Sequence, residues 1–427
     1  MTGSGPSGTS DGNDNRDDGL PPDPFPGDPF DTSAAPPSVN ADTSGGPFGA
    51  MFGDMLRMAG AHGPLNWDLA RQVAVWSAAG GLVEPNVEPL ERIRLEELCA
   101  IAEPHVAAAT GLTVSRGRIT VQTMTRAGWA AQALDDFRPL LERLAAALGG
   151  SATGGSATGE AAPAPDTDPM AGLTRLLAPM LVGMQAGSLV GHLATTSLAT
   201  YDLPIPRPAS DAIGFVPANI AAFASEWTIP IESARMHVCL AELTTHAVLR
   251  IEHVHRELGS LLGSYAGAFR IDPDAMGEQL GSLSGFDPNN PSSIERILGD
   301  PRALLGAVET AEQRTTRARI DVLFAVIAGY VEHIVGSAGA RVLGDNRMVM
   351  EAWKRRRINS DSGQRLVGEL FGLSLSQERH DVGVQFIGGV LERAGSDPLG
   401  ELWNGVDHIP TANELVAPGL WLARIGH

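Results

Sequence analysis

The chain has 427 residues, of which 43% are hydrophobic, and its formal net charge is −19 with histidines counted as neutral. A chain of this length and apolar content can form one large or two medium domains with a sizeable core. Binding to nucleic acid or to an anionic membrane requires a basic surface that neutralises phosphates, so we expect neither as a partner.

Residues 1–46 form an acidic tail of low complexity. They contain eight Asp and one Arg, a net charge of −7, among Gly, Pro, Ser and Asn. Such a segment buries too little apolar surface to offset the entropy lost on ordering, and we expect it to be disordered. Residues 47–62 add Met and Phe at loose helical spacing. This favours a short docking helix, on the chain's own domain or on a partner.

Ordered structure is expected over residues 63–427. Asn66 is a suitable N-cap for a first helix, and a second amphipathic helix is predicted over Pro89–Ala108. Leu112–Thr123 alternates polar and apolar residues, which is typical of a hairpin or a loop. Thr125–Leu148 is predicted as one long helix that a proline interrupts.

Residues 149–168 read GSATGGSATG followed by APAPDTDP, the composition of a flexible insertion. Met170–Leu189 returns to a helical pattern, and Tyr201–Pro208 is rich in proline and is predicted to be extended. The stretch Met184–His192 offers a serine and a histidine but lacks the Gly-x-Ser-x-Gly turn of a nucleophile elbow. We interpret it as packing of small residues between helices.

Ile231–Leu262 is predicted as one long buried helix, because its apolar residues recur at helical spacing without an early Gly or Pro. A metalloprotease zinc helix contains His-Glu-x-x-His, since imidazoles four residues apart lie on one face and share a metal while the Glu activates the bound water. Here Glu242 is present, but the two ligand positions hold Ala241 and Thr245.

The C-terminal part continues as helices. Arg341–Arg357 ends in the basic run Lys354–Arg357, which we predict to be a solvated helix end, and Ser376–Ala394 is the last long helix. Trp403 and Trp421 are expected to anchor the short elements that follow. Strand signals are scarce, so the fold class is mainly α.

Two cysteines, Cys99 and Cys239, are too few for a disulfide framework, and both fall within apolar helical patterns. We expect buried, reduced thiols, as in a cytoplasmic protein. The sequence has no basic segment followed by an apolar core, so we expect no secretory signal. The most apolar run, Val322–Val331, is shorter than the roughly 18–20 residues of a membrane span.

Five stretches between Gly63 and Arg424 resemble an actinobacterial family of zincin-like proteins, described as hydrolases or zinc-dependent metalloproteases and partly of unknown function. They are GPLNWDLARQVA at 63–74, MQAGSLVGHLATTSLATYDLPIPRP at 184–208, VCLAELTTHAVLRIEHV at 238–254, EAWKRRR at 351–357 and LWNGVDHIPTANEL at 402–415. The resemblance implies a mainly α, zincin-like helical domain. Its central metalloprotease-type helix, Glu232–Leu258, is expected to pack between the N-terminal and C-terminal helices.

The resemblance also implies where zinc would be held. The family helix is similar to His-Glu-Leu-Thr-His, so its two ligand positions correspond to Ala241 and Thr245 and its general base to Glu242. A further family acid, in a Glu-Gly-Tyr stretch, corresponds to Ala328. Alanine has no donor atom, and a threonine hydroxyl replaces imidazole poorly at neutral pH. We therefore expect no metal cofactor at these positions.

Other residues offer alternatives. On a continuous helix, Glu242, His246 and either Arg250 or His253 follow one face. They form either a ladder of ion pairs and hydrogen bonds or a displaced metal site in which His246 and His253 hold zinc. A later His333 is a candidate to join them.

The sequence thus predicts a zinc-dependent metalloprotease-like protein that is non-catalytic, a pseudoenzyme, because Glu242 has no metal-bound water to activate. Its cleft is expected to bind a peptide or protein partner. The alternative is an active metal-dependent hydrolase or peptidase with displaced ligands such as His246 and His253. A third hypothesis is a scaffold in which residues 1–61 recruit a partner. The substrate and the oligomeric state stay open.

Overall fold

The computed structural model describes residues 65–151, 169–269, 310–358, 367–368, 370–373 and 376–427. Its contacts divide the chain into residues 1–51 and 52–427, and all described residues belong to the second unit. The predicted acidic tail and docking segment lie outside the described residues. Residues 152–168 of the predicted insertion also lie outside the described residues. The first three residues of that insertion, 149–151, are the end of a helix.

The first described helix, α2 (Trp67–Ala78), begins where the cap was predicted, because the side chain of Asn66 accepts a hydrogen bond from the backbone N–H of Leu69 at 3.0 Å. It packs against α6 (Pro169–Thr196). Three glycines of α6 lie at four-residue spacing, and a Cβ on any of them would collide with a backbone carbonyl of α2 or its cap: Gly183, Gly187 and Gly191. The interpretation of this stretch as small-residue packing is confirmed.

A helix and two short strands follow. The helix α3 (Pro89–Thr110) precedes strand β1 (Thr120–Thr123), which pairs in parallel with β2 (Ala212–Phe215). Of the two alternatives for Leu112–Thr123, the loop is confirmed for residues 112–119. The hairpin is wrong, because Thr120–Thr123 forms β1 and pairs with a strand far along the chain. Strands of four residues carry little pattern, and a parallel pair has no turn to mark it in the sequence.

The single helix expected over Thr125–Leu148 is two helices, α4 (Arg126–Asp136) and α5 (Arg138–Ser151). The break falls at Phe137, which is buried. Pro139 lies in the first turn of α5, where a missing N–H costs little.

The predicted long helix over Ile231–Leu262 is also two helices, α8 (Ile231–Leu249) and α9 (Glu252–Gly267). Ile251 is extended, with φ −64° and ψ 118°. Arg250 ends α8, and its guanidinium contacts Asp211 and the carbonyl of Ser210 in the segment before β2. Long-range contacts thus accompany a break that the apolar periodicity does not indicate.

The remaining elements are helical. They are the 3₁₀ turn η1 (Thr200–Asp202) and α7 (Pro217–Glu226), then α13 (Ala311–Leu343), α14 (Arg347–Ile358) and α16 (Gln377–Ala394), and finally η3 (Asp397–Trp403), η4 (Val406–His408), α17 (Ala412–Val416) and α18 (Pro418–Ile425). The described chain is mainly helical, as predicted, with Trp403 and Trp421 both buried near its end.

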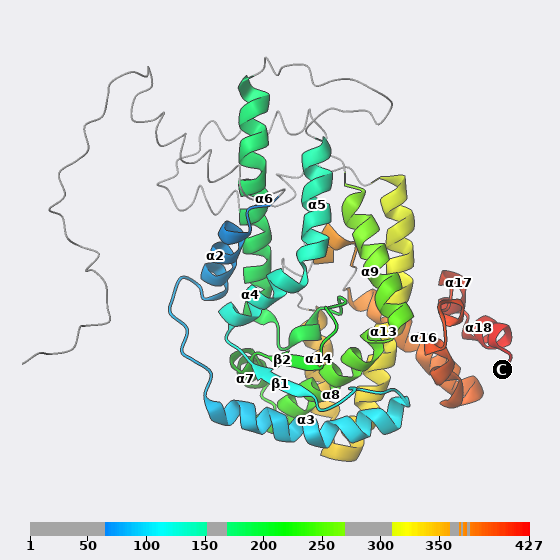
Figure 1. The fold of residues 1–427 in the computed structure, drawn as a ribbon. Coiled ribbons are helices and arrows are strands. Elements are labelled where there is room, and N and C mark those ends of the chain that lie inside the picture. The colour runs from blue at the N-terminus through cyan, green and yellow to red at the C-terminus, as the bar shows by residue number, and fades with distance from the viewer. Residues whose placement is uncertain (1–64, 152–168, 270–309, 359–366, 369, 374–375) are drawn as a thin grey trace, which may run out of the picture. The chain divides into compact units, whose positions relative to one another are not determined.

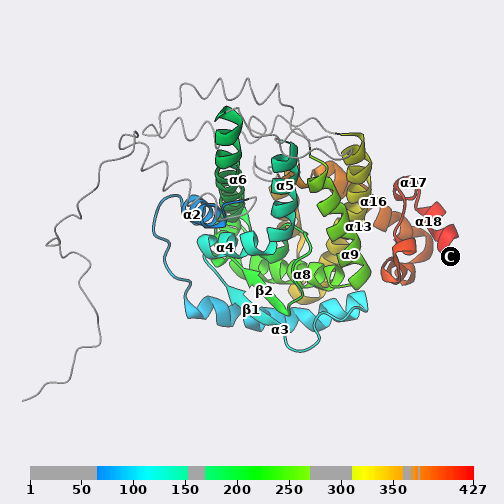
Figure 2. The same ribbon diagram turned by 45° about the horizontal axis from the view of Figure 1, so that its top comes forward.

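The helices α6, α5, α9 and α13 stand in a row, and α3 runs across one end of the row beneath β1, β2 and α8 (Figure 1). Figure 2 shows α17 and α18 beside α16, on the side of α13 away from α6. By length and composition alone α13 could cross a membrane. It is nevertheless mostly buried, against α3, α8, α9 and α16, as a core helix is.

Candidate functional site

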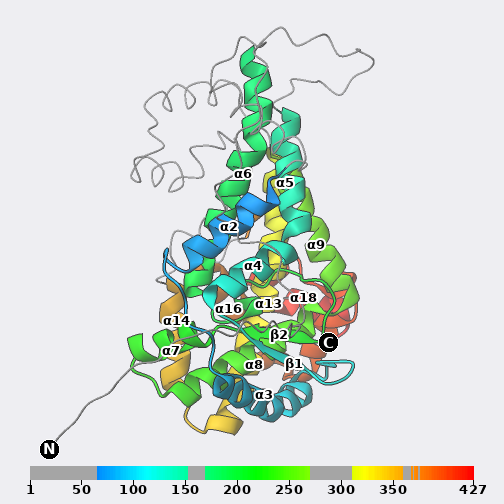
Figure 3. The same ribbon diagram turned by 60° about the vertical axis from the view of Figure 1, so that its left-hand side comes forward.

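A pocket of about 160 Å³ lies between α8, α13 and the segment that carries η1, with α14 and α16 completing its wall. Figure 3 shows α8 and α13 at the centre of the unit, with α14 on one side of them. The pocket contains the central motif of α8, because Ala241, Glu242 and Thr245 all line it. Ala328, on α13, lines the same pocket.

Glu242 is only 3% exposed, and both of its carboxylate oxygens accept a hydrogen bond from the backbone N–H of Tyr201, at 2.9 and 3.1 Å. Burial raises the pKa of Glu242 to about 8, against the opposing effects of that N–H and of Arg207. At neutral pH the side chain is therefore mainly a neutral carboxylic acid, which can donate a hydrogen bond as well as accept one.

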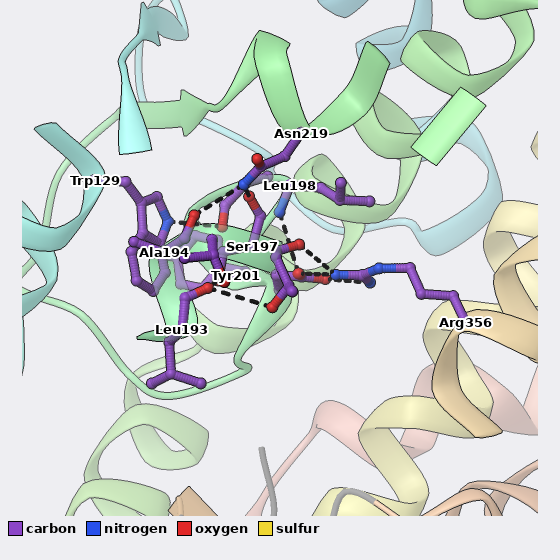
Figure 4. A network of polar contacts seen from close by, with 12 residues as sticks. Trp129, Leu193, Ala194, Ser197, Leu198, Tyr201, Asn219 and Arg356 are labelled. Carbon is purple, nitrogen blue, oxygen red and sulfur yellow. Dashed lines mark hydrogen bonds and ion pairs between the residues drawn. The ribbon is translucent and has the colours of Figure 1, made fainter. Parts of the chain in front are cut away.

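The segment that presents Tyr201 is fixed by side chains from several elements (Figure 4). Asn219 donates its amide hydrogens to the carbonyls of Ala194 and Ser197, at 2.9 and 2.7 Å. From another side, the indole of Trp129 donates to the carbonyl of Ala199 at 3.1 Å. These bonds satisfy backbone carbonyls at and after the end of α6. The backbone N–H of Tyr201, in the same segment, is bonded to Glu242.

The three positions that the resemblance assigns to zinc ligands lie in the same pocket as Glu242, but they carry no ligand set. Ala241 and Ala328 present methyl groups. Thr245 donates its hydroxyl hydrogen to the carbonyl of Ala241, one turn earlier in α8, at 2.8 Å. Among the described residues, no group of three or more His, Cys, Asp or Glu side chains is arranged to hold a metal ion.

The alternative ligands lie on three different helices. His246 is fully buried, outside the pocket lining, with Nδ1 at 3.3 Å from the hydroxyl of Tyr201. Burial, with a smaller effect from Arg250, lowers its pKa to about 4. His253 lies on α9, beyond the break, so it does not share a helix face with His246. His333 does not line the pocket either.

The basic run at the end of α14 is divided between solvent and pocket. Lys354 and Arg355 are exposed, as predicted for a solvated helix end. Arg356 and Arg357 instead line the pocket, with side chains only 16% and 17% exposed. The prediction is wrong for this pair, because they share a helix face with Trp353, which also lines the pocket.

Two acids hold these arginines in place. Asp202, in η1, accepts hydrogen bonds from Arg356, the shorter at 2.5 Å, and from the N–H of Leu198. Glu332, one turn after Ala328 on α13, pairs with Arg357 at 2.7 Å. Both ion pairs bind α14 to the elements that form the pocket wall.

Several residues that line the pocket were not predicted as site residues from the sequence. His237 is 2% exposed, and its ring packs against that of Trp353 with the planes tilted by 57° and the centroids 4.6 Å apart. His380, on α16, lies 3.1 Å from Glu332. Because His237 precedes Ala241 by four residues, helix periodicity alone was sufficient to find it. The motif EAWKRRR marked Trp353 as part of the family pattern, but gave no reason to place it in the cleft.

The buried acid gives a testable pH dependence. The folded-state pKa of Glu242 is about 8 and its ordinary value is near 4.5, so the folded state retains the proton over that interval. The free energy of unfolding of the natural chain should therefore fall, relative to that of a Glu242→Gln variant, as pH rises from about 5 to 8, by roughly 4 kcal/mol at most. Urea unfolding at several pH values measures the difference, in which the histidines common to both proteins cancel. A difference that does not vary with pH would show that Glu242 is ionised in the folded state.

Two comparisons with known proteins found similarities to the chain. A family model described as "Zincin-like metallopeptidase" matches residues 65–422. The chain is similar in structure to a "putative hydrolase with a novel fold" from Chloroflexus aurantiacus, with a TM-score of 0.54 and 19% sequence identity, covering 85% of this chain and 99% of that chain. At this identity the similarity shows a common fold. No curated protein matches the chain.

Proposed function

The chain belongs to the zincin-like metallopeptidase family, and we propose that it is a non-catalytic member whose cleft binds a peptide or protein partner without cutting it. Zinc hydrolysis needs three protein ligands and an open position for water. The residues at the corresponding positions do not fit a zinc ion.

One observation carries the proposal. Ala241, Thr245 and Ala328, the positions that the resemblance assigns to zinc ligands, line a single pocket beside Glu242. The two methyl groups have no donor atoms, and the one hydroxyl is bonded to its own helix.

The state of Glu242 supports the same conclusion. A general base must be ionised at the working pH, and a nearby cation would favour that form. In this pocket burial raises the pKa of Glu242 to about 8, so at neutral pH the group can donate a hydrogen bond to a bound peptide.

The alternative of an active hydrolase with displaced ligands has less support. It requires His246 and His253 to approach one ion, and they lie on separate helices with His246 against Tyr201. We therefore retain partner binding as the proposed function.

A peptide mixture tests the proposal directly. The untagged protein is incubated with the mixture, with and without added zinc, and new peptide ends are sought by mass spectrometry while retained peptides are recovered by size filtration. We expect retained peptides and no new ends, and we expect retention to be lost in Ala328→Phe, whose ring fills the pocket. Zinc-dependent cleavage that disappears in Glu242→Gln would establish a hydrolase instead. Cleavage that persists in that variant identifies a contaminating protease.

A further inference from the structure

Much of the pocket lining is apolar. Ala241 and Ala328 line it together with Phe324, Ile327, Val331 and Trp353. Its volume of about 160 Å³ is below the roughly 300–1,000 Å³ of sites for drug-sized ligands. Such a space suits one apolar side chain, whose burial strengthens binding by roughly tenfold or more.

Three guanidinium groups line the same pocket, but they differ in how far they are engaged. Arg356 contacts both oxygens of Asp202 and the carbonyl of Thr196, and Arg357 contacts Glu332 and Gln377. Arg379, in the first turn of α16, has a side chain that is 49% exposed.

Arg379 makes one ion pair within the described part of the chain, from Nη2 to Asp321 at 3.1 Å. A guanidinium has five N–H donors in a rigid fork that matches a carboxylate. Since Arg379 lines the pocket and is half exposed, it retains donors that face solvent or a ligand.

The acids that line the pocket do not oppose a bound anion. In the described residues these are Asp202, Glu242 and Glu332. The first and third are paired with arginines. Both oxygens of Glu242 accept a hydrogen bond from the backbone N–H of Tyr201.

We propose that the pocket binds the C-terminal residue of a peptide, with its apolar side chain against Ala241 and Ala328 and its carboxylate on Arg379. This rests on the proposed function, which it narrows to one class of peptide. The C-terminal residue of a peptide can carry both an apolar side chain and a free carboxylate. Within a chain these two groups belong to different residues.

Three fluorescent peptide pools, identical except at the last residue, test the inference on the full chain by fluorescence anisotropy. The first ends in leucine with a free carboxylate, the second in leucinamide and the third in serine with a free carboxylate. We expect the first pool to bind about tenfold or more tightly than either of the others, since a charged hydrogen bond and an apolar contact are each of that size.

Two variants separate Arg379 from general charge. Arg379→Gln should abolish the preference for acid over amide. The control Arg355→Gln should keep it, because Arg355 is exposed on α14, pairs with Glu351 and does not line the pocket. If Arg379→Gln does not fold, a salt titration of the natural chain replaces it: added salt should weaken binding of the acid pool and not of the amide pool.

The outcomes distinguish this inference from the function on which it rests. Equal binding of the acid and amide pools would overturn the carboxylate contact, and equal binding of the leucine and serine pools would overturn insertion of the side chain. Either result leaves peptide binding in place. Failure of all three pools to bind would overturn this inference and the proposed cleft function together.

Discussion

Restoring three side chains should turn the pocket into a zinc site. The variant Ala241→His, Thr245→His, Ala328→Glu is expected to be purified with about one zinc per chain, and the natural chain with close to none. Histidines four residues apart on α8 present their imidazoles to one face, and the new glutamate reaches the same pocket from α13. Elemental analysis of untagged protein gives the metal content.

A matched variant controls for side-chain bulk. Glutamine at the same three positions adds comparable volume without a strong ligand for zinc, so this protein should purify nearly metal-free. A chelator should lower the unfolding temperature of the restored variant and leave the glutamine variant unchanged. Near-stoichiometric zinc in the natural chain would contradict a non-catalytic role. A folded restored variant without zinc would show that these three positions do not form the family's metal site.

Local signals in the sequence were sufficient to predict where two of the helices begin. Asn66 caps α2 and Ser376 caps α16, each by accepting a hydrogen bond from a backbone N–H three residues later. Such caps depend on neighbouring residues alone and are therefore readable from sequence. The anchors Trp403 and Trp421 were also predicted, and both are buried.

Long-range contacts were not readable. The break between α8 and α9 accompanies the contact of Arg250 with Asp211, 39 positions earlier, and β1 pairs with a strand beyond three helices. The apolar periodicity of a short stretch of sequence gives no information on such distant partners. The same limit applies to the partners of residues 356 and 357, because Asp202 and Glu332 are carried by other elements.

The site was predictable to the extent that it lies on one helix. The spacing of Ala241, Glu242 and Thr245 alone indicates a shared face. That Ala328 joins them was implied only by the family resemblance, and the structure places it in the same pocket. The role of these residues stays a prediction until the metal content is measured.

Among the glycines that the structure describes, those at the crossing of α13 and α16 should be the most sensitive to an added methyl group. A Cβ at Gly383 would overlap the carbonyl oxygen of Ala325, and one at Gly329 would overlap the backbone of Gly383. Gly383→Ala is therefore expected to lower the free energy of unfolding by roughly 3 kcal/mol or more, measured by urea unfolding, because the obstacle is backbone and no side chain can rotate away.

Gly388→Ala, on the same helix, is the matched control. A Cβ at Gly388 meets no atom within 4 Å, so this change should be neutral or stabilise by up to about 1 kcal/mol through helix propensity alone. Equal effects at the two positions would show that α13 and α16 do not cross as closely as described. The crossing also matters for the pocket, since α13 supplies Ala328 and α16 supplies Arg379. If Gly383→Ala folds by moving these helices apart, it should weaken peptide binding as well, whereas Gly388→Ala should bind as the natural chain does.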